Sequence, residues 1–386
     1  MIYLDYAATT PLSPAVLQGM LPYLQAEFGN PSSIYQLGQR ARYAVDRSRA
    51  SVAGMLGVDP AEITFTGGST ESNNLALSGV LWAAKKRGTD RPHLITSSIE
   101  HSAILEHAAW LESIGFAVTY VGCDATGTID PATIAAAITP QTALISIMYA
   151  NNEVGSIQAL PEIAAIAHER GMPVHTDATQ AAGQLPVDLR TLGVDLLSLS
   201  AHKFYGPKGV GLLAAKRSVA IDWQQHGGGQ EGGRRGGTEN VAGIVGLGLA
   251  LEEAERTREA YVAHTRTLRD ALWTMLQQED TGISLNGPNL DANRLANNLN
   301  IHLPGIQGET MLLSLDLADV AASAGSACSV GRNEPSHVLM AMGQSAEDAR
   351  CALRLTVGRP TSEAEIAEAA AIIGETIARL AMMTSG

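Results

Sequence analysis

Short apolar runs recur along the chain to about residue 215, with helical periodicity between them. These runs lie at 62–65, 93–97, 117–121, 143–149, 173–177, 195–199 and 210–214. Runs of this length, bounded by small and polar residues, are typical of buried strands. Strands that alternate with helices favour a mostly parallel sheet covered on both faces. The pattern therefore predicts an α/β fold.

Polar side chains gather where several of these runs end. They are Thr70, His101, Asn152, Asp177 with Gln180, and Lys203. Because the carboxyl ends of parallel strands share one edge of a sheet, we expect these residues to converge on a single site.

Lys203 is the lysine best placed for chemistry. The chain has five lysines, and Lys203 directly follows an apolar run, with Ser200 and His202 beside it as donors. A buried lysine can form an imine with a carbonyl compound, although a salt-bridged lysine is the alternative. Asp177 ends the preceding strand, and a lysine together with an aspartate is what pyridoxal phosphate requires.

Two glycine-rich stretches are candidates for phosphate binding. Gly67-Gly68-Ser69-Thr70 opens a helix, where free N–H groups favour an anion, although a simple N-cap is the alternative. The stretch 225–240 carries Arg234 and Arg235, which could donate to a phosphate, or it is a flexible linker. Four arginines of the helix expected after the turn at 28–33 are placed on a solvated face: Arg40, Arg42, Arg47 and Arg49.

A second reactive group follows a long helix expected at 241–278. Cys328 lies among alanines, serines and glycines, a setting that favours an exposed nucleophile, whereas Cys123 and Cys351 are expected to be core residues. Its thiol needs a neighbouring cation or an acid–base group to become a thiolate. Arg354 lies in a strand pattern, where it could clamp a substrate carboxylate or form a structural salt bridge.

Composition narrows the function classes. The 386 residues carry a net charge of −13, which argues against a nucleic-acid surface. The start lacks the pattern of a signal peptide, and no apolar stretch is long enough to span a bilayer. Three cysteines without a pairing motif predict neither disulfides nor a metal site. We expect a cytoplasmic protein that uses no metal.

The motifs resemble those of the cysteine desulfurases of the NifS/IscS type, among the fold-type I pyridoxal phosphate enzymes. The matching stretches run in the family's order to about Pro360: 3–11, 28–33, 70–73, 100–101, 151–153, 177–180, 200–203, 236–238, 325–328 and 334–337. The resemblance implies a large domain at 15–257 with a mostly parallel seven-stranded sheet. It also implies a smaller α+β domain at 1–14 and 258–386, with the cysteine loop at about 321–335.

The resemblance also implies roles for particular residues. Lys203 would form the imine with pyridoxal 5'-phosphate, and Asp177 would contact the ring nitrogen. His101 would stack on the ring as an acid–base group, and Cys328 would accept sulfur. The remaining expected contacts are Gln180 on the ring oxygen, Asn152 near ring and substrate, Arg354 on the substrate carboxylate, Ser69, Thr70, Ser200 and His202 on the phosphate, and Thr238 from the second subunit of a homodimer.

The activity implied is removal of sulfur from L-cysteine, giving L-alanine and a persulfide that passes to an acceptor protein. Selenocysteine lyase and aminotransferase are the nearest alternatives, because the same lysine and aspartate would serve them. A non-catalytic scaffold is a further one. The chain departs from the family at Tyr35, where many members have histidine, at Arg332 in the cysteine loop, and in lacking the longer C-terminal tail of IscS-type proteins.

Overall fold

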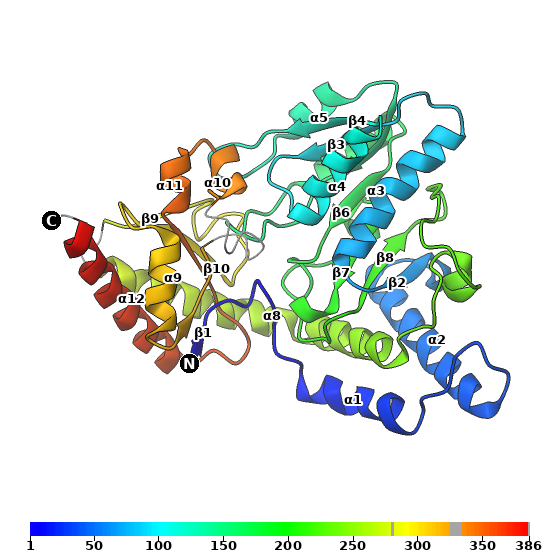
Figure 1. Cartoon of the computed structure of the whole chain (residues 1–386), viewed down its shortest axis with the longest axis horizontal. Coiled ribbons are helices and arrows are strands. Elements are labelled where there is room, and N and C mark those ends of the chain that lie inside the picture. The colour runs from blue at the N-terminus through cyan, green and yellow to red at the C-terminus, as the bar shows by residue number, and fades with distance from the viewer. Residues whose placement is uncertain (279–281, 325–333, 385–386) are drawn as a thin grey trace.

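A seven-stranded sheet organises the larger part of the molecule (Figure 1). The computed structural model describes residues 1–278, 282–324 and 334–384. The strand order is β2-β8-β7-β6-β5-β3-β4, and only β8 runs antiparallel to its neighbours. The predicted mostly parallel sheet is confirmed. Its strands are β2 (Ile63–Thr66), β3 (His93–Ser97), β4 (Ala117–Val121), β5 (Thr142–Ser146), β6 (Val174–Asp177), β7 (Leu196–Ser200) and β8 (Gly211–Ala215).

Neighbouring residues of the inner strands β3, β5, β7 and β8 enter different apolar clusters. Leu196 packs in one cluster with residues of α3 (Ser69–Lys86) and α4 (Ser102–Ser113), whereas Leu197 packs in another with residues of α2 (Gln36–Leu56) and α6 (Leu160–Glu169). Side chains alternate between the two faces of a strand, so a strand buried on both sides reads as a continuous apolar run. This explains why the strands were visible in the sequence.

The remaining part has its own sheet and core. An antiparallel sheet of order β12-β10-β9 packs with α9 and α12 around a separate apolar cluster. The elements are β9 (Ser284–Leu285), β10 (Asn298–His302), β12 (Ala352–Thr356), α9 (Gly308–Asp316) and α12 (Glu363–Thr384). Two short helices before β12, α10 (His337–Ala341) and α11 (Ala346–Arg350), pack in the sheet-bearing core through Val338, Leu339 and Ala349. The larger part also contains α5 (Pro131–Ala137) and α7 (Leu189–Leu192).

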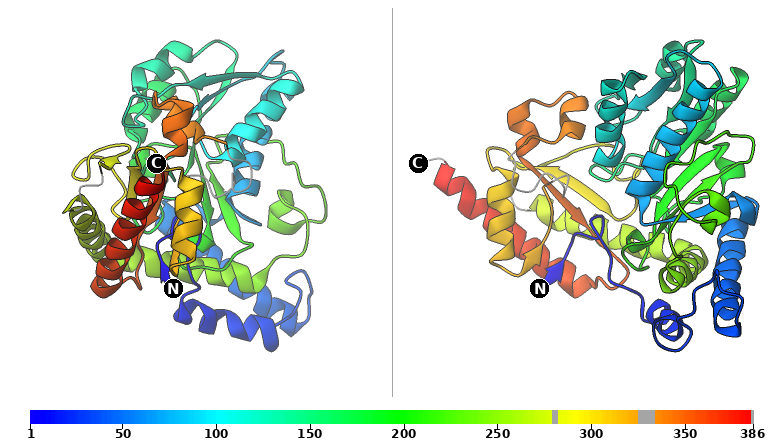
Figure 2. Two further views of the ribbon diagram at one scale, coloured as in Figure 1. Left: turned by 60° about the vertical axis from the view of Figure 1, so that its left-hand side comes forward. Right: turned by 45° about the vertical axis from the view of Figure 1, so that its right-hand side comes forward.

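One long helix, α8 (Val241–Gln278), joins the two parts, as Figures 1 and 2 show. Its residues up to Ala254 pack in the sheet-bearing core, whereas Leu268, Leu272 and Leu276 pack in the smaller core. The predicted domain boundary at residue 257 falls between these two sets and stays a prediction.

The N-terminal segment crosses between the two parts. Strand β1 (Ile2–Tyr3) pairs with β11 (Val320–Ala321), and Asp5 bridges to Thr356 of β12. The chain then passes the end of the central sheet before α1 (Pro14–Gln25) begins. Within residues 1–278, 282–324 and 334–384, no helix combines the length and apolar character that a membrane span needs.

Candidate active site

Lys203 lies one turn beyond β7, at the carboxyl end of the sheet. Its Nζ donates to the carbonyl oxygens of Ala7 at 2.6 Å and Ala8 at 2.7 Å, so the N-terminal segment covers the lysine. The side chain lines a cavity of about 250 Å³, to which five strand ends contribute. Its lining includes His101, Asn152, Asp177, Gln180, Lys203, Arg354, Ser69, Thr70 and His202. The structure therefore brings together nine of the eleven residues expected to contact cofactor or substrate.

Asp177 ends β6 and is buried in the floor of this cavity. Its Oδ2 accepts a hydrogen bond from Asn73 Nδ2 at 2.7 Å, and its Oδ1 accepts one from the backbone N–H of Thr179 at 2.9 Å. Both of these donors are neutral, and neither hydrogen bond comes from an arginine or a lysine. Asn73 was given no role from the sequence, although a fully buried amide on the first turns of a helix is a signal of a polar partner.

His101 is the N-cap of α4, and this fixes its ring. Its Nδ1 accepts a hydrogen bond from the backbone N–H of Ala103 at 3.1 Å, so in the neutral ring the proton sits on Nε2. Burial lowers the pKa of His101, and the charge of Lys203 lowers it further, whereas Asp177 opposes the shift. The ring is therefore a neutral acid–base group at neutral pH.

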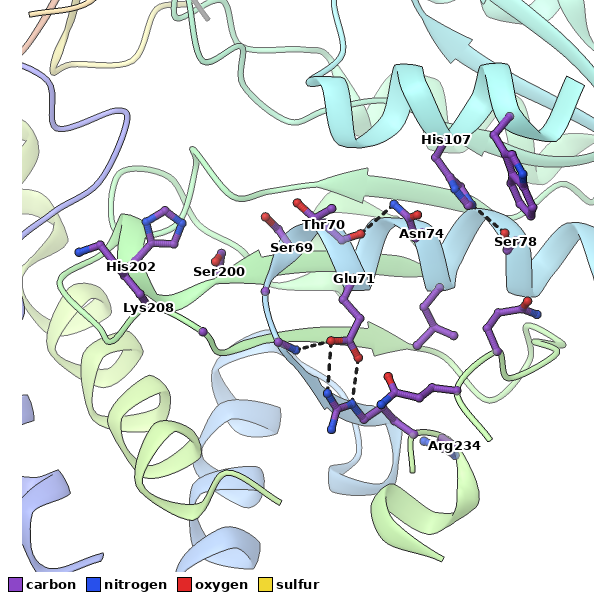
Figure 3. Close-up of a pocket in the computed structure, with 18 of the residues that line it drawn as sticks. Ser69, Thr70, Glu71, Asn74, Ser78, His107, Ser200, His202, Lys208 and Arg234 are labelled. Carbon is purple, nitrogen blue, oxygen red and sulfur yellow. Dashed lines mark hydrogen bonds and ion pairs between the residues drawn. The ribbon is translucent and has the colours of Figure 1, made fainter. Parts of the chain in front are cut away.

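The expected phosphate residues lie around the start of α3 (Figure 3). Ser69 and Thr70 open this 18-residue helix, and Ser200 and His202 approach from the end of β7. A Cβ at Gly211 would lie 2.7 Å from the Cα of Gly68, so β8 can approach the helix start only through glycine. Ser200 lines the adjoining cavity of about 990 Å³, which shares Ser69, Thr70 and His202 with the smaller one.

His202 is held beside the N-terminal segment. Its Nδ1 lies 3.1 Å from the Oγ1 of Thr9. Burial, with the nearby charges of Lys203 and Lys208, lowers the pKa of His202 to about 4. A neutral imidazole in this place can donate a hydrogen bond to an anion without carrying a charge.

Arg354 forms the structural ion pair that was one of the two roles weighed from the sequence, whereas its contact with a substrate carboxylate stays a prediction. It is 2% exposed, and its Nη2 pairs with Asp5 Oδ1 at 2.8 Å, which is a structural ion pair. Its Nη1 donates to the carbonyl oxygen of Asn152 at 2.8 Å. Its Nε has no hydrogen-bond partner among the described residues, and the side chain lines the cavity. The guanidinium therefore keeps donor capacity for a ligand.

Comparisons with known proteins agree with this geometry. Residues 2–368 match the family described as Aminotransferase class-V. The chain is 46% identical to the cysteine desulfurase IscS of Dictyoglomus turgidum over 95% of this chain and 91% of that one. It is 45% identical to the cysteine desulfurase IscS of Methanosarcina thermophila, over 99% and 93% respectively. The chain belongs to the cysteine desulfurase family.

Solved structures of this family have the same fold. A NifS-like protein superposes with a TM-score of 0.91 at 36% identity, covering 98% of this chain and 99% of that one. A second, titled SspA in complex with cysteine, superposes with a TM-score of 0.78 at 37% identity, covering 93% and 99%. The resemblance drawn from the motifs is confirmed.

The glycine-rich stretch is anchored, and two expectations about arginines were wrong. Arg42 and Arg49 of α2 are only partly exposed, at 30% and 14% of the side chain, because they pair with the buried side chains of Glu239 at 2.5 Å and Glu231 at 2.7 Å. Thr238 is exposed and does not line the cavity of its own chain, so its expected contact stays a prediction.

The other two arginines, Arg234 and Arg235, also have protein partners. Arg235 pairs with Glu71 at 2.9 Å, and Arg234 donates to the carbonyl oxygen of Ala61. These bonds therefore use N–H groups that the sequence analysis considered as donors to a phosphate. Glutamates within the stretch and on α3 were the missed signal, because a buried carboxylate needs a cation.

Cys328 and Arg332 lie outside the described residues. The described chain on either side lies near the cavity: Ser323 pairs with the cavity residue Arg354 through two backbone hydrogen bonds, and Ser336 Oγ donates to Oε2 of Glu153, the neighbour of the cavity residue Asn152, at 2.5 Å. The other two cysteines are poor nucleophiles. Burial raises the pKa of the Cys123 thiol to about 11 and also raises that of Cys351.

Proposed function

We propose that this protein is a pyridoxal phosphate-dependent cysteine desulfurase that converts L-cysteine to L-alanine and leaves the sulfur as a persulfide on Cys328. The observation that carries the proposal is the cavity in which Lys203 and Asp177, from two strand ends of the central sheet, meet Arg354 from the middle of β12. The cofactor needs an amine for its aldehyde and an acid for its ring nitrogen, and an amino acid substrate needs a cation for its carboxylate. Curated relatives named cysteine desulfurase support the reaction class.

The residues present fit pyridoxal phosphate. Asp177 offers a buried carboxylate, and Thr179 Oγ1 is buried without a partner among the described residues. The helix start next to Gly68, kept open by Gly211, suits the phosphate group. When bound, the cofactor supplies an aldehyde for an amine and a ring that withdraws electrons from the substrate's α-carbon.

The chain's own residues would divide the work as follows. Lys203 would hold the aldehyde, and Asp177 would keep the ring nitrogen protonated, with Gln180 on the ring oxygen. Arg354 would bind the substrate carboxylate through charge-assisted hydrogen bonds. His101, held neutral by burial, would exchange the protons that the reaction moves.

Sulfur transfer would fall to Cys328. Its thiolate would form a bond with the substrate sulfur while the carbon–sulfur bond breaks, and the electron pair of that bond, once protonated, completes L-alanine. In the described chain that flanks this segment, Ser323 contacts the cavity residue Arg354, and Ser336 contacts Glu153, the neighbour of the cavity residue Asn152. That arrangement supports a role for the segment in the site.

A homodimer would complete the phosphate site. Thr238 is exposed on a stretch that Arg42 and Arg49 anchor through ion pairs, as a residue offered to a second copy would be. The larger cavity beside Ser69 and Thr70 leaves room for it. The persulfide would pass to an acceptor protein for iron–sulfur cluster assembly or thiolation, and a cytoplasmic location stays a prediction.

The test measures sulfide and alanine released from L-cysteine in the presence of a reductant. We expect equal amounts from the wild type and from Cys123→Ser, and neither product from Cys328→Ser, which should keep the cofactor's absorbance. Full activity in Cys328→Ser would refute the sulfur transfer. Turnover restricted to selenocysteine, or to an amino acid with a 2-oxo acid, would favour the lyase or the aminotransferase.

A further inference from the structure

Two cavity residues each adjoin a fully buried glutamate. His101 follows Glu100, and Asn152 precedes Glu153; both glutamates are 0% exposed. Burial raises the pKa of Glu100 to about 8, and its carboxyl contacts Ser97 Oγ at 2.6 Å. Neither glutamate contributes to the cavity lining, so the functions assigned above leave both unexplained.

A pair of residues at the start of α10, Ser336 and His337, contacts both glutamates. Ser336 Oγ donates to Glu153 Oε2 at 2.5 Å, and His337 Nε2 donates to the carbonyl oxygen of Glu100 at 2.9 Å. That carbonyl belongs to the peptide bond that leads into His101. Ser336 and His337 open α10, which lies on the side of the smaller part nearer the central sheet (Figure 1).

The Ser336 hydroxyl has little freedom to point elsewhere. As the N-cap of α10 it accepts the backbone N–H of Leu339 at 3.2 Å, which leaves its single hydrogen for Glu153. One side chain therefore caps a helix and ties that helix to the segment that bears Asn152.

This segment is held from both parts of the molecule. On the sheet side, Asn151 Oδ1 accepts the backbone N–H groups of Glu153 at 2.8 Å and of Val154 at 2.9 Å. On the other side, Asn298 and Asn300 donate to the carbonyl oxygen of Glu153 at 3.0 Å and 3.1 Å. With Ser336 on the carboxylate, the residue next to Asn152 has its backbone and its side chain fixed.

We propose that Ser336 and His337 are positioning residues for the reaction, holding Asn152 and His101 in register from the start of α10. The inference rests on the proposed function, because that function supplies the reaction. The claim that Ser336 and His337 hold their neighbours rests only on the described contacts. It predicts that losing these contacts disturbs catalysis without emptying the cofactor site, because neither side chain lines the cavity.

The second residue also acts through charge. The charged groups that act on His101 are Asp177, Lys203, Glu153 and His337: the two carboxylates raise its pKa, whereas burial, Lys203 and His337 lower it. Replacing His337 by a neutral donor should therefore move the protonation of His101 to higher pH.

The experiment compares two helix caps of equal size. Ser345 caps α11, another five-residue helix, through the backbone N–H of Asp348 at 3.1 Å, but bonds to nothing at the cavity. We expect Ser336→Ala to lower kcat/KM for L-cysteine about 10- to 100-fold, because the buried carboxyl of Glu153 loses its hydrogen bond beside Asn152, and Ser345→Ala to change it less than about twofold. Ser336→Thr keeps the hydroxyl and should restore most of the rate.

Two readouts do not depend on turnover. Hydrogen exchange at the amides of Glu153 and Val154 should accelerate in Ser336→Ala and not in Ser345→Ala. In protein labelled on histidine, NMR titration should show a higher pKa for His101 in His337→Gln, which keeps a donor without the charge, than in the wild type.

The outcomes separate the two proposals. If Ser336→Ala and Ser345→Ala showed the same amide hydrogen exchange and the same kcat/KM, the role of Ser336 would be overturned. If the pKa of His101 were the same in His337→Gln as in the wild type, the role of His337 would be overturned. A wild type that releases no sulfide would refute the desulfurase, whereas the exchange and titration measurements would still decide whether these residues position the site.

Discussion

Replacing Arg354 by lysine separates substrate binding from structural support. The guanidinium already gives one N–H to Asp5 and one to the carbonyl of Asn152, both at 2.8 Å, and its Nε has no partner among the described residues. Lysine keeps the charge but offers one nitrogen in place of a planar fork. Arg354→Lys can therefore satisfy the protein or the ligand, but not both with good geometry.

The expected loss follows from the bonds removed. One hydrogen bond to a charged group is worth about 1.5–3 kcal/mol, which is about 10- to 150-fold in affinity. We expect KM for L-cysteine to rise by that factor in Arg354→Lys. Cysteamine lacks the carboxylate, so its binding, followed through the cofactor's absorbance, should change by less than about threefold.

Asp5→Asn is the matched control. It weakens the ion pair but leaves the guanidinium, so L-cysteine should still bind much better than in Arg354→Lys. If Arg354→Lys weakened cysteine and cysteamine equally, the arginine would support the fold and would not bind the carboxylate. An unchanged KM would refute the reasoning as well.

Three further changes test the packing and the electrostatics. Gly211→Ala should destabilise the protein by about 1–3 kcal/mol and weaken cofactor binding, because the new methyl would overlap Gly68, as urea unfolding and cofactor titration can measure. Glu231→Ala should lower the free energy of unfolding by about 3 kcal/mol, because it strands the Arg49 charge, which is 14% exposed. Burial lowers the pKa of His107 to about 4, whereas in the unfolded chain this side chain binds a proton at about pH 6.5. The free energy of unfolding should therefore fall as the pH drops from about 6.5 towards about 4. His107→Gln should make that fall shallower.

Each of these changes has a control in the same chain. A Cβ added at Gly54 in α2 would meet nothing within 4 Å, so Gly54→Ala should stabilise by about 0.5–1 kcal/mol. Glu27 pairs with Arg40 at the surface, and Glu27→Ala should cost less than about 1 kcal/mol. Equal effects of Glu231→Ala and Glu27→Ala, or the same pH slope in His107→Gln as in the wild type, would contradict the burial argument.

The strand ends could be predicted because a strand that is buried on both faces appears in the sequence as a continuous apolar run. Leu196 and Leu197 enter cores on opposite faces of the sheet, so the sequence shows an unbroken apolar run, and Lys203 is the first lysine after it. The position of Lys203 followed from that run, that of Asp177 from the run at 173–177, and their proximity from the rule that parallel strands end together.

Contacts between distant segments could not be predicted in the same way. Arg49 is separated from Glu231 by 182 residues, and an arginine on an amphipathic helix looks the same whether it faces water or a buried carboxylate. The bonds from Ala7 and Ala8 to Lys203 use backbone carbonyls, which every residue has, so no side-chain pattern marks them.

The N-terminal segment has a consequence for how the enzyme is made. The backbone N–H of Ala7 bonds to the hydroxyl of Thr356, 349 residues later, and β1 pairs with β11 at Val320. The ribosome releases the first of these segments early and the last at the end, about 17–70 s apart at roughly 5–20 residues per second. Until then the N-terminal segment, which covers Lys203, lacks its contact with Thr356. A half-made chain therefore cannot assemble this site, and competence to handle reactive sulfur arrives only with the last part of the protein.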